Sequence, residues 1–243
     1  MVDWQAVKRV LWYLKGSVDC DIPLKPSKIH GLITFSDADW GSCPHDWKLV
    51  SGYCVYFGDS LISWSSKKQH VVSQSSTKSK YRALALAVPE LIWLQSLMKE
   101  LRIALPICPL IWCDNMSAGS LAANPIFHAR TKHLEIDLHF VRDKVLQQDL
   151  EVRYVPSCDQ FADCFTKALA VTQHQYLRSK LSVIESSFRL SGAVRKHTEI
   201  HSSALTHQHS TMPCPSYNWA KSSFVLCVAF SHIQYLLYSV VVV

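Results

Sequence analysis

Apolar and polar positions divide the first half of the chain into a helix, three strands and a second helix. The apolar residues of segment 4–14 recur at helical spacing, and the run stops at Gly16, a residue that often ends helices. Stretches rich in β-branched and aromatic residues predict three strands, over Leu32–Ser36, Gly52–Phe57 and Leu61–Ser65. Gly58-Asp59 separates the last two and predicts a hairpin.

From Ser75 to Leu101 the apolar residues recur at helical spacing, which predicts a helix. One apolar stripe on this helix comprises Leu84, Ala87, Leu91, Leu94 and Met98. Pro89 interrupts the pattern, and an internal proline costs a helix about 3 kcal/mol. We therefore expect a kink or a break at this position.

The second half alternates between strands and helices. The pattern predicts a strand at Pro109–Cys113, helices at Ser117–Ala123 and Thr131–Gln147, a strand at Leu150–Val155 and a helix at Asp159–Leu181. Strands followed by alternating helices and strands predict an α/β fold, a five-stranded mixed sheet flanked by helices.

The chain changes character near Val183, where periodicity gives way to Ser, His and Thr. The sequence therefore predicts a poorly ordered C-terminal tail over 183–243. Its last stretch, Phe224–Val243, is long enough to cross a bilayer, but His232, Gln234 and several serines make a membrane span unfavourable.

Composition narrows the class of protein. With 243 residues, of which 49% are hydrophobic and 18% charged, the chain can bury a core and is not a disordered protein. An excess of 25 Lys and Arg over 19 Asp and Glu suits a polyanionic partner without requiring one. Nine cysteines without CxxC spacing, and no cleavable signal pattern, favour a cytoplasmic or nuclear protein that is not secreted.

Several aspartates lie at or after the ends of predicted strands, where the sheet would bring them close together. Asp37 and Asp39 end the first sheet strand, Asp114 follows the fourth, and Asp163 lies in the helical segment after the fifth. Clustered carboxylates need a neutralising cation, which indicates magnesium or manganese. Each aspartate alone is equally compatible with a solvated turn or a helix cap, so spacing leaves both interpretations open.

Several motifs resemble one family in their order and spacing. They are SDADW (36–40), SGY (51–53), ISWSSKKQ (62–69), CDN (113–115), NPIFHARTKHLEIDLHFVRDKV (124–145) and QFADCFTK (160–167). Together they resemble the ribonuclease H region of copia-type retrotransposon Pol polyproteins. The resemblance implies a linker helix from the reverse transcriptase side over 1–28 and a ribonuclease H-like domain over 29–182, without the polymerase itself.

The resemblance also implies a reaction, the hydrolysis of RNA in RNA–DNA hybrids with two Mg²⁺ or Mn²⁺ ions. By motif, Asp37, Asp114 and Asp163 match the family's acidic metal ligands. Other parts of the retrotransposon polyprotein are further expected partners.

The fourth acidic ligand is replaced. The family pattern SSTEAEY reads SSTKSKY here, so lysines stand at positions 78 and 80. Lys80 lies four residues before Leu84 on the sheet-facing stripe, whereas Lys78 is about 200° away around the helix. We therefore expect Lys80 to point at the aspartates and to impair metal binding. The alternative is that the three aspartates still hold metal and residual activity survives.

Basic and polar residues near these motifs predict nucleic-acid contacts. They are Lys67, Lys68, Asn115, His128, Arg130, Lys132 and His133. A solvated helix face is the alternative for the histidine-rich stretch. Two function classes follow, namely a ribonuclease H and a catalytically inactive relic or passive nucleic-acid-binding module.

Overall fold

The computed structural model describes residues 2–39, 49–69, 75–123 and 132–185. Its elements are α1 (Val2–Ser17), β1 (Cys20–Asp21), β2 (Leu32–Asp39), β3 (Val50–Phe57), β4 (Ser60–Lys68), α2 (Ser76–Glu100), β5 (Leu110–Cys113), α3 (Met116–Ala123), α4 (Lys132–Leu146), β6 (Glu151–Tyr154), the 3₁₀ helices η1 (Ser157–Asp159) and η2 (Phe161–Phe165), α5 (Val171–Lys180) and β7 (Ile184–Glu185). No helix in these ranges has the length and apolar character that a membrane crossing requires. The predicted tail lies outside the described residues from 186 onward.

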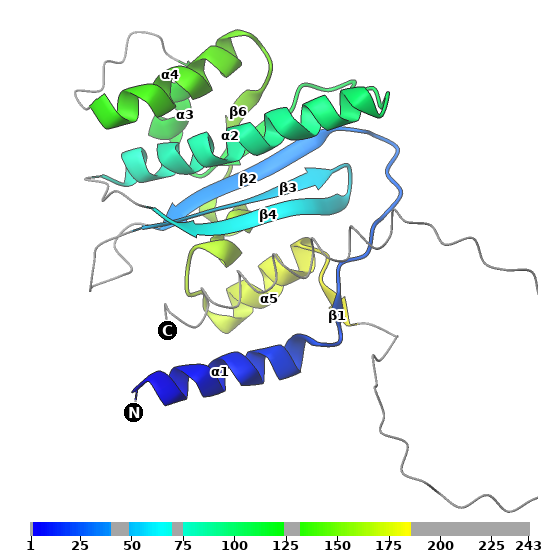
Figure 1. The fold of residues 1–243 in the computed structure, drawn as a ribbon, viewed down its shortest axis with the longest axis vertical. Coiled ribbons are helices and arrows are strands. Elements are labelled where there is room, and N and C mark those ends of the chain that lie inside the picture. Colours follow the sequence, from blue (N-terminus) through cyan, green and yellow to red (C-terminus); the bar gives the residue numbers. More distant parts are fainter. Residues whose placement is uncertain (1, 40–48, 70–74, 124–131, 186–243) are drawn as a thin grey trace, which may run out of the picture.

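The main sheet has the strand order β4-β3-β2-β5-β6. β2, β3 and β4 pair antiparallel, and β5 and β6 run parallel to β2. The predicted five-stranded mixed sheet is therefore confirmed. In Figure 1, α2, α3 and α4 cover one face of this sheet, while α5 and α1 lie on the other side.

Alternating side chains along the strands build an apolar cluster on each face. On the α2 side, Val55 and Ile111 pack with Leu84 and Leu91, and all four are fully buried. On the α5 side, Phe35, Tyr56 and Leu177 belong to a second cluster. At roughly 25 cal/mol per Å² of buried apolar area, these two clusters are the main stabilising contribution to the fold.

Of the kink or break expected at Pro89, the break does not occur, because α2 continues from Ser76 to Glu100, and the kink stays a prediction. Pro89 lies on the exposed side of α2, where water can satisfy the carbonyl group that loses its hydrogen-bond partner. The neighbouring Glu90 accepts a hydrogen bond of 2.7 Å from the Ser63 hydroxyl of β4, which ties this part of the helix to the sheet.

The single helix expected over Asp159–Leu181 is wrong. The segment forms η1, η2 and α5 instead. One physical reason is the carbonyl of Phe165, which accepts a 2.7 Å hydrogen bond from the Ser66 hydroxyl of β4. In a continuing helix, the carbonyl of Phe165 would accept from a backbone N–H four residues later. Here it accepts from the side chain of Ser66.

A small ladder that the sequence did not predict joins the two ends of the described chain. β1 pairs antiparallel with β7, with Cys20 opposite Glu185 and Asp21 opposite Ile184. Two-residue strands carry no periodic signal. The division at residue 183 stays a prediction, although residues 184–185 pair with the segment after α1.

Candidate active site

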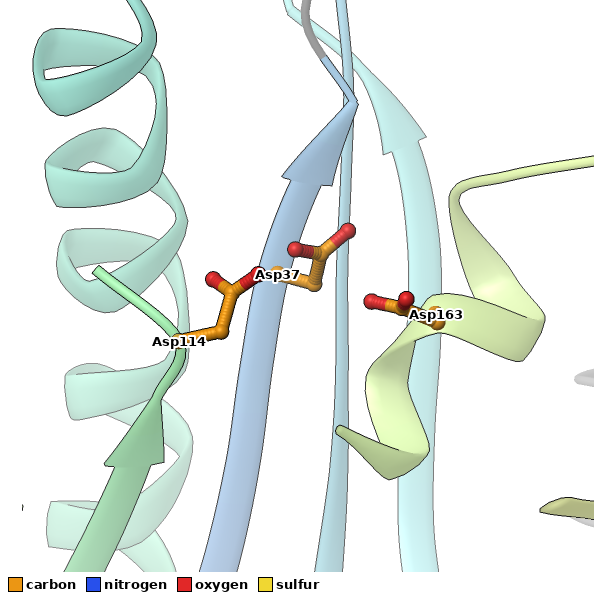
Figure 2. Close-up of side chains that lie close together, drawn as sticks. All are labelled: Asp37, Asp114 and Asp163. Atoms are coloured by element: carbon orange, nitrogen blue, oxygen red, sulfur yellow. The ribbon is translucent and has the colours of Figure 1, made fainter. Parts of the chain in front are cut away.

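Three carboxylates meet at one edge of the main sheet. Asp37 comes from β2, Asp114 directly follows β5, and Asp163 lies in η2. One oxygen from each lies within 4.8 Å of the others, and Figure 2 shows the side chains turned toward a common space. Since β2 and β5 are parallel neighbours, their carboxyl ends reach the same edge, as expected from the sequence.

β2 extends further than predicted, to Asp39, so Asp37 lies inside the strand rather than after it. Asp37 is fully buried and stands opposite Gly52 of β3. A Cβ at Gly52 would lie 2.8 Å from the Phe165 Cβ and 2.9 Å from the Thr166 Cγ2. The glycine of the SGY motif therefore lets η2 approach the sheet beside Asp37.

Gln160 fixes η2, and with it Asp163. The Gln160 side chain is buried and donates a 3.1 Å hydrogen bond to the carbonyl of Ser36 in β2. Its Oε1 accepts from the backbone N–H of Ala162 and so caps η2. The first residue of the QFAD motif thus joins the strand of Asp37 to the helix of Asp163.

Lys80 of α2 reaches two of the three carboxylates, those of Asp37 and Asp114. Its Nζ donates to Asp37 Oδ1 and lies 2.7 Å and 2.8 Å from the two oxygens of Asp114. Ser75 caps α2 by accepting from the N–H of Lys78, which sets where the helix begins. The expected approach of Lys80 to the aspartates is therefore present.

Electrostatics keep Lys80 charged. Burial alone lowers the pKa of Lys80, but the negative charges of Asp37 and Asp114 and their hydrogen bonds outweigh burial and raise the pKa above its ordinary value. A divalent ion between Asp37 and Asp114 would need the position that this ammonium fills. The residues as they stand thus do not fit a metal ion there.

A second lysine, which sequence reasoning missed, also reaches the cluster. Lys167 Nζ lies 2.8 Å from Asp163 Oδ1, 3.5 Å from Asp37 Oδ1 and 4.0 Å from Asp114 Oδ2. The Thr166 hydroxyl donates to Asp37 Oδ2, and the Ser157 hydroxyl to Asp114 Oδ2. The i,i+4 spacing of Asp163 and Lys167 within QFADCFTK was the available signal.

Asp163 has an altered pKa. Burial, and then the charge of Asp37, raise the pKa of Asp163 to about 7, against the opposing effects of Lys167 and Lys80. Five ionisable groups, three carboxyl groups and two amino groups, therefore share one largely buried space.

The predicted nucleic-acid contacts fall in different places. Lys67 and Lys68 are exposed at the end of β4, which β3 separates from the strand of Asp37. Through β3, Lys67 is in register with residue 38 of β2, and Lys68 with residue 39. Asn115 follows Asp114, and its side-chain oxygen accepts from the N–H of Ala118 to cap α3. Asn115 is thus next to the acidic cluster in the chain, whereas the two lysines lie two strands away from Asp37.

The other four predicted contact residues cannot be placed as side chains. His128 and Arg130 lie outside the described residues. Lys132 and His133 begin α4, but their side chains also lie outside the described part of the structure. Lys78, by contrast, is partly buried on α2, and no ion pair links it to the three aspartates among the described residues.

Comparisons with known proteins identify relatives over most of the chain. The retrovirus-related Pol polyprotein from transposon RE2 of Arabidopsis thaliana is 44% identical over 192 residues, 79% of this chain and 13% of that polyprotein. The RE1 polyprotein of the same plant is 46% identical over 179 residues, 74% of this chain and 12% of the relative. The chain thus spans about an eighth of the length of these relatives. A scan against protein-family models found no match.

Solved structures give weaker matches. LC11-RNase H1, isolated from compost, has a TM-score of 0.43 and 13% identity, covering 57% of this chain and 94% of its own. The RNase H domain of a Mycobacterium tuberculosis protein has a TM-score of 0.41 and 10% identity, covering 62% of this chain and 97% of its own.

The mixed sheet and its flanking helices define an α/β domain, the architecture that the sequence predicted. The sequence relatives then give the family. The chain belongs to the retrovirus-related Pol polyproteins of copia-type transposons.

Proposed function

We propose that this chain is a retrotransposon-derived domain that binds RNA–DNA hybrids, and that Lys80 impairs the metal-dependent hydrolysis of the RNA strand expected of its family. The observation that carries the proposal is the contact of the Lys80 ammonium with both Asp37 and Asp114. In an intact site, one or two Mg²⁺ or Mn²⁺ ions would supply the activated water and stabilise the leaving oxygen.

The charge balance gives the reason for the impairment. A glutamate at position 80 would add a fourth carboxylate to Asp37, Asp114 and Asp163, whereas lysine changes the local charge by two units in the opposite direction. The ammonium satisfies the buried aspartates, so the fold keeps its cluster without a metal ion. The ammonium thereby provides the positive charge that the aspartates need, but it cannot replace a metal ion in the hydrolysis of RNA.

Cleavage of a labelled RNA–DNA hybrid by the full chain, in Mg²⁺ or Mn²⁺, tests the impairment. We expect undetectable or slow cleavage by the unmodified protein and at least a ~100-fold faster rate for Lys80→Glu, since each 1.36 kcal/mol of transition-state stabilisation is tenfold in rate. Lys78→Glu is the matched control and should recover little. Equal rates for the unmodified protein and Lys80→Glu would show that Lys80 does not impair catalysis.

Hybrid binding is tested separately, in a chelator and without cleavage. Lys67 is an exposed cation at the end of β4, so Lys67→Gln should weaken hybrid binding and reduce the slope of log K against log salt by about 0.9, as expected for one lost phosphate contact. Lys99→Gln, at the opposite end of α2, is the control. Absence of hybrid binding by the unmodified chain would favour the second candidate, a relic without nucleic-acid function.

A further inference from the structure

The acidic cluster contains two lysines whose contacts differ. Lys80 bonds Asp37 and Asp114, whereas Lys167 bonds Asp163 and lies within 4.0 Å of the other two carboxylates. Lys167 is therefore the ammonium group that lies near all three aspartates. A divalent ion held by these aspartates would lie close to it.

The two lysines also differ in how firmly they are held. The Lys80 side chain is 10% exposed and projects from α2, the long helix that packs along the sheet. The Lys167 side chain is 27% exposed and follows η2 directly. A long, partly exposed side chain can turn its ammonium into water without disturbing apolar packing. If the Lys80 ammonium moved into water, the buried carboxylates of Asp37 and Asp114 would lose the positive charge that pairs with them.

We propose that Lys167 is a second counter-cation of the acidic cluster: it pairs with Asp163 in the unmodified chain, and once Lys80 is replaced by glutamate it competes with a divalent ion for the same carboxylates. Lys167 is thus a positioning residue for the aspartates and not a metal ligand. The inference rests on the part of the proposed function in which Lys80 blocks the metal position. It adds that removing Lys80 alone restores only part of the metal affinity.

The formal charge of the cluster explains why removing Lys80 alone should restore only part of the metal affinity. With every carboxyl group counted as ionised, as it would be when it binds a metal ion, three aspartates with Lys80 and Lys167 carry a charge of about −1, Lys80→Glu makes it about −3, and a further Lys167→Gln makes it about −4. An ammonium within hydrogen-bond distance of a metal-binding carboxylate repels the ion and occupies one of its oxygens. Removing Lys167 should therefore tighten binding of a divalent ion by about tenfold or more in the Lys80→Glu background.

The experiment measures Mn²⁺ binding to the full chain by calorimetry and electron paramagnetic resonance. Four proteins are compared: the unmodified chain, Lys80→Glu, Lys167→Gln and the double variant. We expect no binding by the unmodified chain or by Lys167→Gln, measurable binding by Lys80→Glu, and binding about tenfold tighter by the double variant. Lys167→Arg in the Lys80→Glu background should bind as weakly as Lys80→Glu, because it retains the charge.

The chain offers a matched control. Lys144 pairs with Asp149 at 2.9 Å, its side chain is 26% exposed, and it lies on α4 outside the cluster. Lys144→Gln in the Lys80→Glu background should leave Mn²⁺ affinity unchanged. Thermal melting in a chelator verifies that each variant is folded.

Three results would overturn the inference: equal Mn²⁺ affinity of Lys80→Glu and the double variant, no binding by the folded double variant, or equal tightening by Lys144→Gln. Failure of the proposed function has a different signature. In that case Lys80→Glu binds Mn²⁺ but does not cleave hybrid, and the comparison with the double variant still decides the role of Lys167.

Discussion

Helix α2 has two regions that differ sharply although they share one face. Leu84 is fully buried in the apolar cluster against the sheet, beside Ile111 of β5. Lys80, one turn earlier, is buried among the carboxylates of Asp37 and Asp114. The same stripe of one helix thus passes from apolar packing to an ion-paired polar cluster within four residues.

The difference shows which part of the helix fixes the fold and which part fixes the chemistry. The apolar region excludes water and holds α2 on the sheet regardless of the residue at position 80. The polar region then accepts either a carboxylate with a cation or an ammonium in the place of that cation. A lysine at position 80 is therefore compatible with an intact fold.

The largest change in stability is expected in the apolar region. Leu84→Ala should lower the free energy of unfolding by roughly 2–5 kcal/mol, because it removes buried apolar contacts and leaves a cavity. In the Lys80→Glu background, the same change should leave Mn²⁺ affinity unaltered. Urea unfolding and calorimetry measure the two quantities. A loss of Mn²⁺ affinity would mean that the two regions are not separable.

Loss of the ammonium should have a smaller effect. Removing one partner of a buried ion pair costs about 3–5 kcal/mol, but Lys167 remains near all three carboxylates, so we expect about 2 kcal/mol for Lys80→Met. Urea unfolding at neutral pH measures it. The double variant Lys80→Met/Lys167→Gln should lose more than the sum of the single changes, and strict additivity would contradict a shared cluster.

Much of both regions was predictable from the sequence. The repeated apolar spacing of α2 gave both its inner face and the direction of Lys80, because helical geometry is regular. The strand runs and the aspartates after them gave the sheet and the place of the carboxylates. Local patterns of this kind depend only on neighbours along the chain.

Contacts between distant segments were not predictable in the same way. Ser66 takes the carbonyl of Phe165 and ends η2, and nothing in the helical pattern of 159–181 signals this bond. Lys167 had a visible spacing from Asp163, but its distances to Asp37 and Asp114 depend on how η2 packs on β3. The sequence could not exclude a break at Pro89, because the exposure that makes this proline tolerable is a tertiary property.

A third prediction concerns the close approach that builds the polar cluster. Gly52→Ala would put a Cβ under 3 Å from Phe165 and Thr166, so η2 must shift. We expect a loss of about 1–2 kcal/mol in stability, as for overpacking, and weaker Mn²⁺ binding in the Lys80→Glu background. Gly119→Ala in α3, where no atom lies within 4 Å of the added Cβ, is the control and should be neutral or stabilising. Unchanged Mn²⁺ affinity for Gly52→Ala would contradict a role of this glycine in placing Asp163.

The smallest effect is a response of the apolar region to alkaline pH. Burial, and then the charge of Glu90, raise the pKa of Tyr53 to about 12 from its ordinary value of 10.0, although hydrogen bonds with Ser65 and Ser63 oppose the shift. The unfolded chain therefore loses this proton at lower pH than the folded protein does. The stabilising contribution of Tyr53 is complete below about pH 10 and is lost as the pH rises through about 12, which amounts to about 1.4 kcal/mol at pH 11.

Lys80 complicates this measurement, because its raised pKa also makes stability fall above the ordinary lysine range. Comparison with Tyr53→Phe removes that contribution, since both proteins retain Lys80. Urea unfolding at pH 9 and pH 11 should therefore show a loss about 1.4 kcal/mol smaller for Tyr53→Phe than for the unmodified protein. Equal losses would mean that the phenol of Tyr53 does not hold its proton more firmly in the folded protein, and that the alkaline response comes from other groups with raised pKa values, such as Lys80 and Tyr81.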